Sequence, residues 1–409
     1  MTFDCDILIS GGGIAGLTAA AAFGAAGFDV ICVDPTPPVT DGAAEGADMR
    51  SPAFLQPAQA FLDAAGLWDR LAPEAQPMHD IKVSDGRAGE GPSPFVLHFD
   101  HHEIEEGPMG FMVEDRHLRR RLLDAMADEP AITHLPGETV TAQETDSRRA
   151  GVTLDSGRTL TGRLLIGCDG RASGTARRAG ITRTEHDYGQ TALVCAIGHA
   201  RPHDGCAHQF FMPAGPLAIL PLTGNRSSIV WSESHEQAAA INALSDADYL
   251  EILRPRFGDF LGDLEVIGPK WSYPLSLVFA ERTIDKRLAL VGDAAHAMHP
   301  IAGQGLNMGL RDVAALAEVV LDAKRLGLDI GDGTMLERYQ RWRRFDNTLM
   351  LAMTDGLNRL FSNDFRPLRL VRDIGLAAVN ALPPLKKVFM RQAMGLVGDL
   401  PRLMRNQPL

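Results

Sequence analysis

Short apolar runs that end in glycine-rich turns recur along the chain and predict its first structural layer. An apolar run at residues 7–9 leads into a turn rich in glycine and then into a helix of small residues over 17–26. A second apolar run follows at 30–33. Strand, turn, helix and strand in this order predict a βαβ unit with a parallel sheet. Residues 35–49, rich in proline and glycine, predict a surface loop, and the apolar periodicity over 56–71 predicts a helix.

The pattern changes after residue 190. Four apolar runs are separated by short turns that contain proline, glycine or asparagine, and these runs cover residues 191–197, 209–212, 217–222 and 228–231. Such spacing is typical of an antiparallel meander. The chain therefore predicts a parallel α/β layer and a separate antiparallel sheet.

The first glycine-rich turn has the spacing of a dinucleotide-binding loop. The loop expected to hold the nucleotide consists of Gly11, Gly13, Ile14, Ala15 and Gly16. Asp34 ends the second strand, at about the ~20-residue distance at which an acidic residue meets a ribose hydroxyl, and its negative charge argues against a 2′-phosphate. The alternative, a structural turn, leaves Asp34 without a role.

A second loop, after the apolar run at 288–291, predicts a site for a flat ligand. Gly292 and Asp293 end the strand, and the Asp293 carboxylate is suited to accept hydrogen bonds from ribityl or ribose hydroxyls. Glycine allows close approach of the backbone, and the following helix directs its N–H groups and positive dipole end toward an anionic reduced flavin. An ordinary strand–turn–helix does not require this density of glycine, proline, aspartate and asparagine. The remaining expected contacts are Pro300, Gly303, Gln304, Gly305, Leu306 and Asn307.

The run HPIAGQGLNMGLRD at residues 299–312 resembles the signature of the ubiquinone-biosynthesis hydroxylases, polyprenylphenol monooxygenases within the p-hydroxybenzoate-hydroxylase-like aromatic hydroxylases. Residues 164–173, followed by Arg177, resemble the DG motif of that superfamily, in which Asp169 lies near the flavin pyrophosphate and the visiting nicotinamide. Arg50 and Arg116 match family positions near the FAD, although a solvated loop charge and a solvated basic face are the alternatives. The three motifs stand in the family's order, and the resemblance covers nearly the whole chain.

The resemblance implies an α/β fold with a Rossmann-like FAD-binding domain, an inserted antiparallel-sheet substrate domain and a helical C-terminal tail. We expect the discontinuous FAD-binding domain to comprise residues 1–75, 105–182 and 270–350, the substrate domain 76–104 and 183–269, and the tail 351–409. In the family the inserted sheet forms the pocket wall opposite the flavin. Phe211, Leu220 and Trp231 are the candidates to line it, although apolar strand residues are more often plain core.

The chain contains one GxGxxG motif, which favours NADH or NADPH as a brief visitor rather than a resident of its own domain. The resemblance implies non-covalent FAD, O2 captured as a flavin C4a-hydroperoxide, and hydroxylation of a polyprenylated phenol or quinol. Because the flavin performs the chemistry, no catalytic side chain is assigned. One alternative is an aromatic hydroxylase of a small soluble acid or a secondary metabolite, which would need a buried cation; the sheet offers only Arg201 and Arg226, both near turns. Another is a non-catalytic flavin-binding partner in a biosynthetic complex.

Composition limits the remaining possibilities. The 409 residues carry a net charge of −12, which argues against a nucleic-acid partner. The five cysteines form no CxxC pair, no apolar run reaches the ~18 residues of a membrane span, and no export signal is evident, so we expect a cytoplasmic protein. The cluster His98, His101 and His102 lacks convincing ligand spacing, and no metal site is expected.

The C-terminal tail has the opposite charge to the rest. From residue 357 onward there are nine Lys or Arg against three Asp or Glu, whereas residues 1–356 carry −18. Lys386, Lys387 and Arg391 alternate with large apolar residues, a composition typical of a segment that lies on anionic lipid. We expect peripheral contact with the inner face of the plasma membrane, or with other ubiquinone-biosynthesis proteins. The alternative is a helix packed on the FAD domain with its bases in water.

Overall fold

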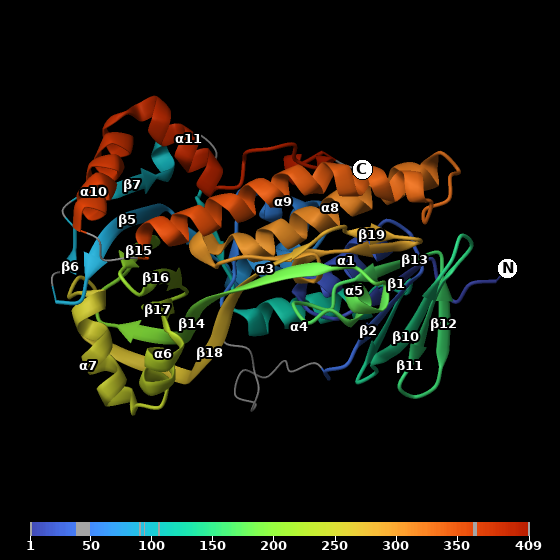
Figure 1. The fold of residues 1–409 in the computed structure, drawn as a ribbon, viewed down its shortest axis with the longest axis horizontal. Helices are drawn as coiled ribbons and strands as arrows, with labels where there is room; N and C mark the ends of the chain where they lie inside the picture. Colours follow the sequence, from blue (N-terminus) through green and yellow to red (C-terminus); the bar gives the residue numbers. More distant parts are fainter. Residues whose placement is uncertain are drawn as a thin grey trace.

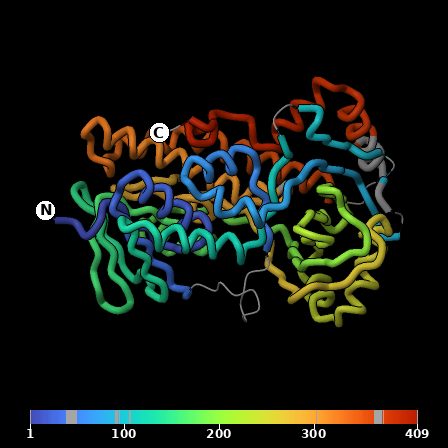
Figure 2. The backbone as a smooth tube through the Cα atoms, turned by 180° about the vertical axis from the view of Figure 1, so that it is seen from behind, coloured from blue at the N-terminus to red at the C-terminus, as the bar shows by residue number. Residues whose placement is uncertain are grey.

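A computed structural model of the chain describes residues 2–37, 50–89, 91–93, 95–104, 107–362 and 366–407 and shows two lobes (Figure 1). The view from behind separates a larger lobe with the N-terminus from a smaller one, over which the red C-terminal helices lie (Figure 2). Of the loop expected at 35–49, residues 38–49 lie outside the described residues.

The larger lobe is built on a six-stranded sheet with the strand order β19-β20-β13-β1-β2-β9. Its strands are β1 (Ile7–Ser10), β2 (Val30–Asp34), β9 (Ile132–Pro136), β13 (Leu164–Gly167), β19 (Ile284–Asp285) and β20 (Leu288–Leu290). All neighbours are parallel except β19 and β20. The carboxyl ends of β1, β2, β13 and β20, which carry the sequence motifs, therefore meet at one edge.

Both faces of this sheet are buried. Ile7 and Ile9 pack toward a layer of helices, whereas Leu8 packs toward a small sheet on the other side. The helices are α1 (Ile14–Ala25), α2 (Gln56–Ala64), α3 (Trp68–Leu71), α4 (Asp115–Ala127), α8 (Gln304–Arg325) and α9 (Gly333–Phe361). The opposite side carries β10 (Val140–Thr145), β11 (Ala150–Leu154), β12 (Thr159–Gly162) and α5 (Gly174–Arg178). Burial on two faces explains why the strands are continuously apolar.

The smaller lobe contains a nine-stranded, mainly antiparallel sheet. Its strands are β5 (Asp80–Arg87), β6 (Gly91–Pro92), β7 (Leu97–Asp100), β14 (Arg183–His199), β15 (Cys206–Met212), β16 (Gly215–Leu222), β17 (Arg226–Ser234), β18 (Leu264–Ala280) and β21 (His296–Ala297). One face packs on α6 (His235–Asn242) and α7 (Asp246–Phe257). Side chains of the other face pack with α9, α10 (Arg366–Ala381) and α11 (Pro383–Ala393).

Short elements complete the connections between the lobes. A three-stranded sheet is formed by β3 (Ala53–Phe54), β8 (Gly110–Met112) and β4 (Gln76–Met78). The 3-10 turns are η1 (Ala72–Glu74), η2 (His101–Glu103), η3 (Gly292–Ala294), η4 (Ile301–Gly303) and η5 (Arg402–Arg405). All five cysteines are free.

The predicted α/β fold with its antiparallel sheet and helical tail is confirmed. One predicted element was wrong in detail. The helix expected over 56–71 is two helices, because Gly66 has a φ of +70° and leaves the right-handed helical region. The domain boundary expected at 269/270 falls inside β18, which runs from one lobe into the other (Figure 1).

Candidate functional site

The loop after β1 is compressed to a degree that only glycine permits. A Cβ on Gly11 would lie 2.5 Å from the carbonyl oxygen of Cys168, and a Cβ on Gly16 would overlap the carbonyl oxygen of Gly11. Gly11 also has a φ of +107°. Gly13 differs, because no heavy atom lies within 4 Å of its Cβ position. The inner side of the loop is closed by the protein, and its outer side is open to a ligand.

Two helices begin at this edge of the sheet without side-chain caps. The N-cap residues are Gly13 for α1 and Gly303 for α8, and neither helix start has a side-chain capping hydrogen bond. Gly303 has a φ of +62°, and the Cβ position of Gly305 is open. The two helices are in contact. Their first N–H groups have no partner within the helix, so both ends favour an anionic ligand.

Acidic side chains flank the loops. Asp34 accepts a hydrogen bond from the Thr36 N–H at 2.7 Å, and its carboxylate lies so close to Gly12 that a Cβ there would overlap it. Asp293 is half-exposed, and Arg171 Nε donates to its Oδ2 at 3.3 Å. Asp34 therefore lies beside the loop after β1, and Asp293 follows Gly292, which also lies beside that loop.

Asp169 has a different local role from Asp34 and Asp293. Its Oδ1 accepts a hydrogen bond from Ser173 Oγ, and its Oδ2 accepts from both the N–H and the hydroxyl of Thr175 at 2.8 Å. The carboxylate therefore orders the start of α5. The half-exposed cation of the same loop is Arg171, which the sequence analysis did not select.

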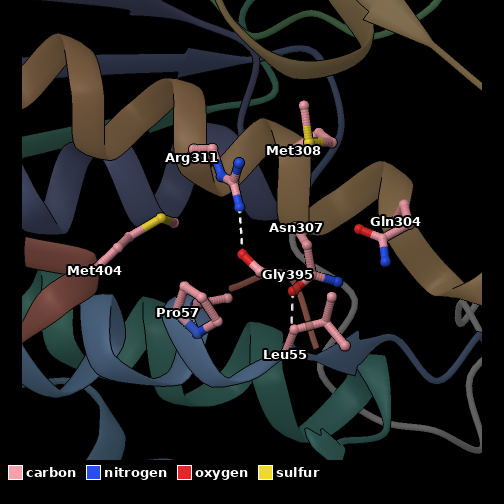
Figure 3. A pocket seen from close by; sticks show the side chains of 9 residues that line it. Leu55, Pro57, Gln304, Asn307, Met308, Arg311, Gly395 and Met404 are labelled. Atoms are coloured by element: carbon pink, nitrogen blue, oxygen red, sulfur yellow. Dashed lines mark hydrogen bonds between the residues drawn. The ribbon is translucent and has the colours of Figure 1, made fainter. Parts of the chain in front are cut away.

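The polar side chains at the start of α8 bind the protein itself. Asn307 accepts from the Leu55 N–H at 2.9 Å (Figure 3). It also donates to the carbonyls of Ala53 and Gly303 at 2.8 Å. Gln304 Nε2 donates to the Ala393 carbonyl at 3.4 Å. These bonds fix residues 299–307, which we call the flavin loop after the family resemblance of this motif, against β3 and the tail. The small pocket there is lined by Leu55, Pro57, Ala58, Gln304, Asn307, Met308, Arg311, Gly395 and Met404.

The other expected loop residues occupy less specialised places. Pro300 is half-buried with a φ of −72°, and Leu306 packs at the border of the main core. Ile14 also borders that core. The methyl group of Ala15 lies 3.7 Å from the Cβ position of Gly292, which joins the two loops.

The two expected arginines lie near strands of the smaller lobe's sheet. Arg50 is exposed, and its guanidinium carbon lies 5.9 Å from the ring centroid of Tyr273. Arg116 Nη2 donates to Glu114 Oε1 at 3.2 Å, and Arg226 Nη2 donates to Glu114 Oε2 at 3.0 Å. Burial opposes ionisation, but these two arginines outweigh it and lower the pKa of Glu114. Arg226 is thus paired with a carboxylate of the larger lobe.

The structure does not bring the three expected wall residues together. Phe211 and Leu220 lie on the sheet face that meets α9, where the Phe211 ring stacks on Phe361 with centroids 4.0 Å apart. Trp231 is fully buried on the opposite face, with its ring 5.9 Å from that of Tyr249. Neighbouring residues of a strand alternate between faces, so Trp231 belongs to the core under α7.

His299 joins the flavin loop to the smaller lobe. It precedes Pro300, is fully buried, and has Nε2 3.2 Å from Oε1 of Gln190 in β14. Asn358 of α9 donates to the same oxygen at 3.2 Å. Burial lowers the pKa of His299 to about 4, so the ring is neutral at neutral pH.

Comparisons with known proteins agree with this geometry. The family described as FAD binding domain matches residues 4–344. The ubiquinone hydroxylase UbiL of Rhodospirillum rubrum is 48% identical over 99% of this chain and 93% of its own length. The 3-demethoxyubiquinol 3-hydroxylase of Escherichia coli K12 is 31% identical over 96% of this chain and 98% of its own. The chain belongs to the ubiquinone-biosynthesis hydroxylase family.

A solved structure supports the fold of this family member. The p-nitrophenol 4-monooxygenase PnpA of Pseudomonas putida DLL-E4 superposes with a TM-score of 0.80, at 19% identity, over 96% of this chain and 98% of its own. The residues present also fit FAD, because the open outer side of the Gly13 loop and two uncapped helix ends form a backbone cradle of the kind that holds a dinucleotide.

The hydroxylase has a buried ionic network that the sequence analysis missed. Asp312 is fully buried and lies 2.6 Å from His296 Nε2; it also accepts from Arg343 Nε at 2.7 Å and from the Gly292 N–H at 3.1 Å. Burial opposes ionisation, but His296 and Arg343 outweigh it and lower the pKa of Asp312 to about 2. The network holds the Gly292–Asp293 turn through the hydrogen bond from the Gly292 N–H to Asp312. Its only signal in the sequence is that Asp312 closes the 299–312 motif.

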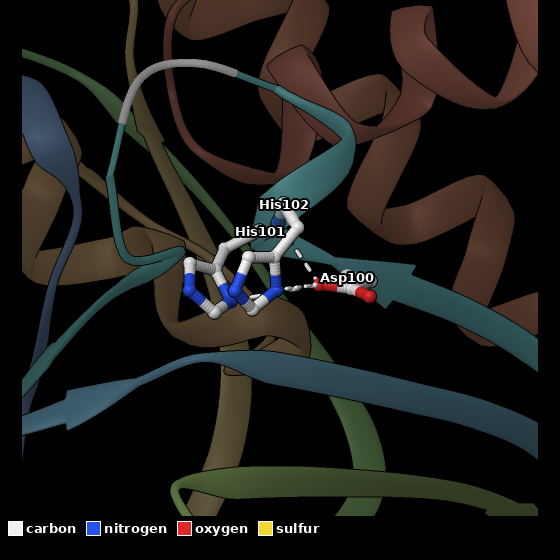
Figure 4. A group of neighbouring side chains, drawn as sticks. All are labelled: Asp100, His101 and His102. Carbon is white, nitrogen blue, oxygen red and sulfur yellow. Dashed lines mark hydrogen bonds and ion pairs between the residues drawn. The ribbon is translucent and has the colours of Figure 1, made fainter.

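One cluster of potential metal ligands occurs among the described residues. Asp100, His101 and His102 offer ligand atoms that lie within 4.8 Å of one another (Figure 4). His101 Nδ1 is also 3.1 Å from the carbonyl oxygen of His79, and His102 is largely exposed. A structural zinc site has four protein ligands, and this cluster offers three. The expectation that the protein binds no metal stays a prediction.

Among the helices in the described part of the chain, none combines the length and the apolar composition needed to cross a bilayer.

Proposed function

We propose that this protein is an FAD-dependent monooxygenase that hydroxylates the aromatic ring of a polyprenylated phenol or quinol in ubiquinone biosynthesis. NADH or NADPH would be the reductant and O2 the source of oxygen. The observation that carries the proposal is the position of the flavin loop. Its last residues form the uncapped start of α8, which contacts α1, and His299 at its beginning contacts Gln190 of the smaller lobe's sheet.

Each part of the site has a role in this proposal. Bound FAD would carry electrons from the nicotinamide to O2 and deliver one oxygen atom to the ring. The loop Gly11–Gly16 and the start of α1 would hold the pyrophosphate, and Asp34 and Asp293 would accept hydrogen bonds from ribose and ribityl hydroxyls. The start of α8 would stabilise negative charge on the ring system. We retain the other expected contacts as proposals, including Arg50, Arg116 and Asp169.

The substrate side favours an apolar ring with a long tail over a small acid. A carboxylate would need a buried cation, but Arg226 is paired with Glu114, and Arg201 is exposed and donates to the Asp259 carbonyl at 3.4 Å. Phe211 and Leu220 instead belong to an apolar cluster between the sheet and the helices that cover it. The apolar wall would also exclude water from the reacting flavin.

The test is to purify the protein, supply FAD, and follow NADH and NADPH oxidation with a short-chain prenylated phenol or with a small hydroxybenzoate. We expect FAD to bind without a covalent link and the prenylated phenol to gain one hydroxyl, detected by mass spectrometry. Turnover of the hydroxybenzoate alone would favour the soluble-substrate alternative. Nicotinamide oxidation with no phenol product would contradict the proposal. In cells that lack the protein, a precursor without one ring hydroxyl should accumulate among the lipid quinones.

The prenylated substrate also implies contact with the cytoplasmic face of the membrane or with other ubiquinone-biosynthesis proteins, because so apolar a molecule does not diffuse freely in water.

A further inference from the structure

The outer face of the α10–α11 hairpin exposes an unusual number of large apolar side chains. The exposed fractions are 55% for Ile374, 54% for Leu382, 40% for Leu385, 61% for Val388 and 42% for Phe389. All lie within one helix, the turn and the first two turns of the next helix. We call Leu382, Leu385, Val388 and Phe389, with the cations Lys387 and Arg391 beside them, the hairpin face.

The inner side of the hairpin is firmly held, so the exposure of the hairpin face is not due to a loosely packed segment. Arg372 Nη2 lies 2.8 Å from Asp85 Oδ2, and both side chains are 3% exposed. Lys386 forms an ion pair with Glu103. Met390 and Met394 are buried in the same apolar cluster as Phe211. The hairpin therefore covers the proposed substrate wall with one side and faces outward with the other.

This geometry changes the sequence expectation for the tail. Lys386 was expected to face lipid together with Lys387 and Arg391, but it is 7% exposed and paired inside the protein. Helical spacing explains the difference, since Lys386 and Met390 are four residues apart and share the buried side. Lys387 and Arg391, also four apart, are both exposed.

Charge decides among the partners that an apolar face can take. Residues 366–393 contain six Lys or Arg and one Asp in a chain of net charge −12. Two of those bases, Arg372 and Lys386, are paired with acids of the smaller lobe. A symmetric contact between two copies would place Lys387 and Arg391 against the same cations of the other chain. Anionic headgroups above acyl chains match both the apolar and the cationic groups.

We propose that the hairpin face docks the protein on an anionic lipid bilayer, with Leu382, Leu385, Val388 and Phe389 at the acyl boundary and Lys387 and Arg391 at the headgroups. The inference rests on the proposed function in one respect, that a lipid-borne substrate gives docking a purpose. The hairpin face would bring the proposed substrate wall to the membrane.

The test measures binding of the full-length, FAD-loaded protein to vesicles of phosphatidylcholine with and without phosphatidylglycerol. We expect binding that increases with the anionic lipid and weakens with salt. The double variant Val388→Ser and Phe389→Ser should bind roughly 100-fold more weakly, since two large apolar groups no longer leave water. Lys387→Gln should lose about fivefold and show a smaller salt dependence.

The matched control removes equally exposed apolar groups elsewhere. Leu326 and Leu328 are 72% and 49% exposed in the turn before α9, and the hairpin follows the other end of that helix (Figure 1). With 29 residues, the helix is about 40 Å long. Leu326→Ser with Leu328→Ser should leave vesicle binding unchanged. An equal loss in the control would show nonspecific adsorption and overturn the proposal, as would wild-type binding by the Val388/Phe389 variant.

Two further measurements separate the possible failures. Sedimentation that shows a dimer abolished by Val388→Ser and Phe389→Ser would identify the face as a contact between copies and overturn lipid docking. Turnover of a soluble short-chain phenol is measured on the same samples. Vesicle binding without any hydroxylation would leave docking supported and refute the proposed function, whereas hydroxylation without vesicle binding would refute docking alone.

Discussion

The nucleotide side and the proposed substrate side of this hydroxylase are built in different ways. The nucleotide side is a surface of backbone groups. Gly11, Gly16 and Gly303 permit the close contacts and positive φ angles that position its N–H groups and helix ends. The substrate side is held by side-chain pairs between segments far apart in sequence, such as Asp85 with Arg372. A backbone site demands glycine at fixed spacing, whereas a side-chain pair can be replaced by many others. The difference also predicts which changes each side tolerates.

Gly16→Ala should have the largest effect of the changes considered, and the effect should be a loss of FAD binding. The new Cβ would overlap the Gly11 carbonyl oxygen, and this neighbour is backbone that cannot rotate away. The strain exceeds the roughly 1–3 kcal/mol of ordinary overpacking. We expect no FAD-loaded protein, measured by flavin absorbance after gel filtration.

The control for that change is Gly356→Ala in α9, where the Cβ position is open. It should retain FAD and gain about 0.5–1 kcal/mol in the free energy of unfolding. Normal flavin content in Gly16→Ala would refute the backbone-cradle assignment.

Asp85→Asn tests the substrate side. It leaves the buried Arg372 guanidinium without its carboxylate, which we expect to lower the free energy of unfolding by about 3–5 kcal/mol. FAD content should be unchanged, because the pair joins α10 to β5, and neither residue is among the hydrogen-bond partners of Gln304, Asn307 or His299 given above. Urea unfolding and flavin absorbance on the same samples check both statements.

The double variant Asp85→Asn with Arg372→Met is the control for the buried charge. It should recover a substantial part of the lost stability, since it removes the buried cation that has lost the Asp85 carboxylate. Loss of FAD in the single variant would show that the two sides are not separable.

His299 lies where the two sides meet, and its pKa gives a pH test. The folded pKa of about 4 lies below the unfolded value of about 6.5, so the neutral ring's contribution is fully present above pH 6.5 and is lost as pH falls toward 4. The shift corresponds to about 3 kcal/mol across that window. His299→Gln should flatten the fall in unfolding free energy between pH 6.5 and 4.

The exposed His102 provides the comparison, because its side chain is 78% exposed. His102→Gln should leave most of the loss of stability between pH 6.5 and 4 in place. A steep wild-type-like curve in His299→Gln would mean that other groups cause the acid sensitivity.

Asp293→Ala should have the smallest effect. The side chain is 44% exposed and shares its charge with Arg171, so we expect the lower end of the range for a charged hydrogen bond, about 1.5 kcal/mol or tenfold weaker FAD binding. Fluorescence titration of apoprotein with FAD measures the change. Asp128→Ala, at a 66% exposed carboxylate, should bind FAD like the wild type, and equal losses in both would argue against a ribityl contact.

The sequence by itself determined the α/β fold, the family and the order of its motifs. The apolar runs at 7–9, 30–33, 164–166 and 288–291 all form strands of one sheet. They are recognisable because a strand that is buried on both faces is apolar at nearly every position. The glycines of the two loops were equally visible, since no other residue fits a close backbone approach or a positive φ.

Only the tertiary structure decided which side chains meet. It separated Trp231 from Phe211, turned Lys386 inward to Glu103, and joined Asp312 to His296 and Arg343. Local spacing fixes the face of an element on which a residue lies, but not which distant element will cover that face. The partner of a buried charge or a wall residue is set by long-range packing, so the substrate side and the hairpin face appear only when the chain has folded.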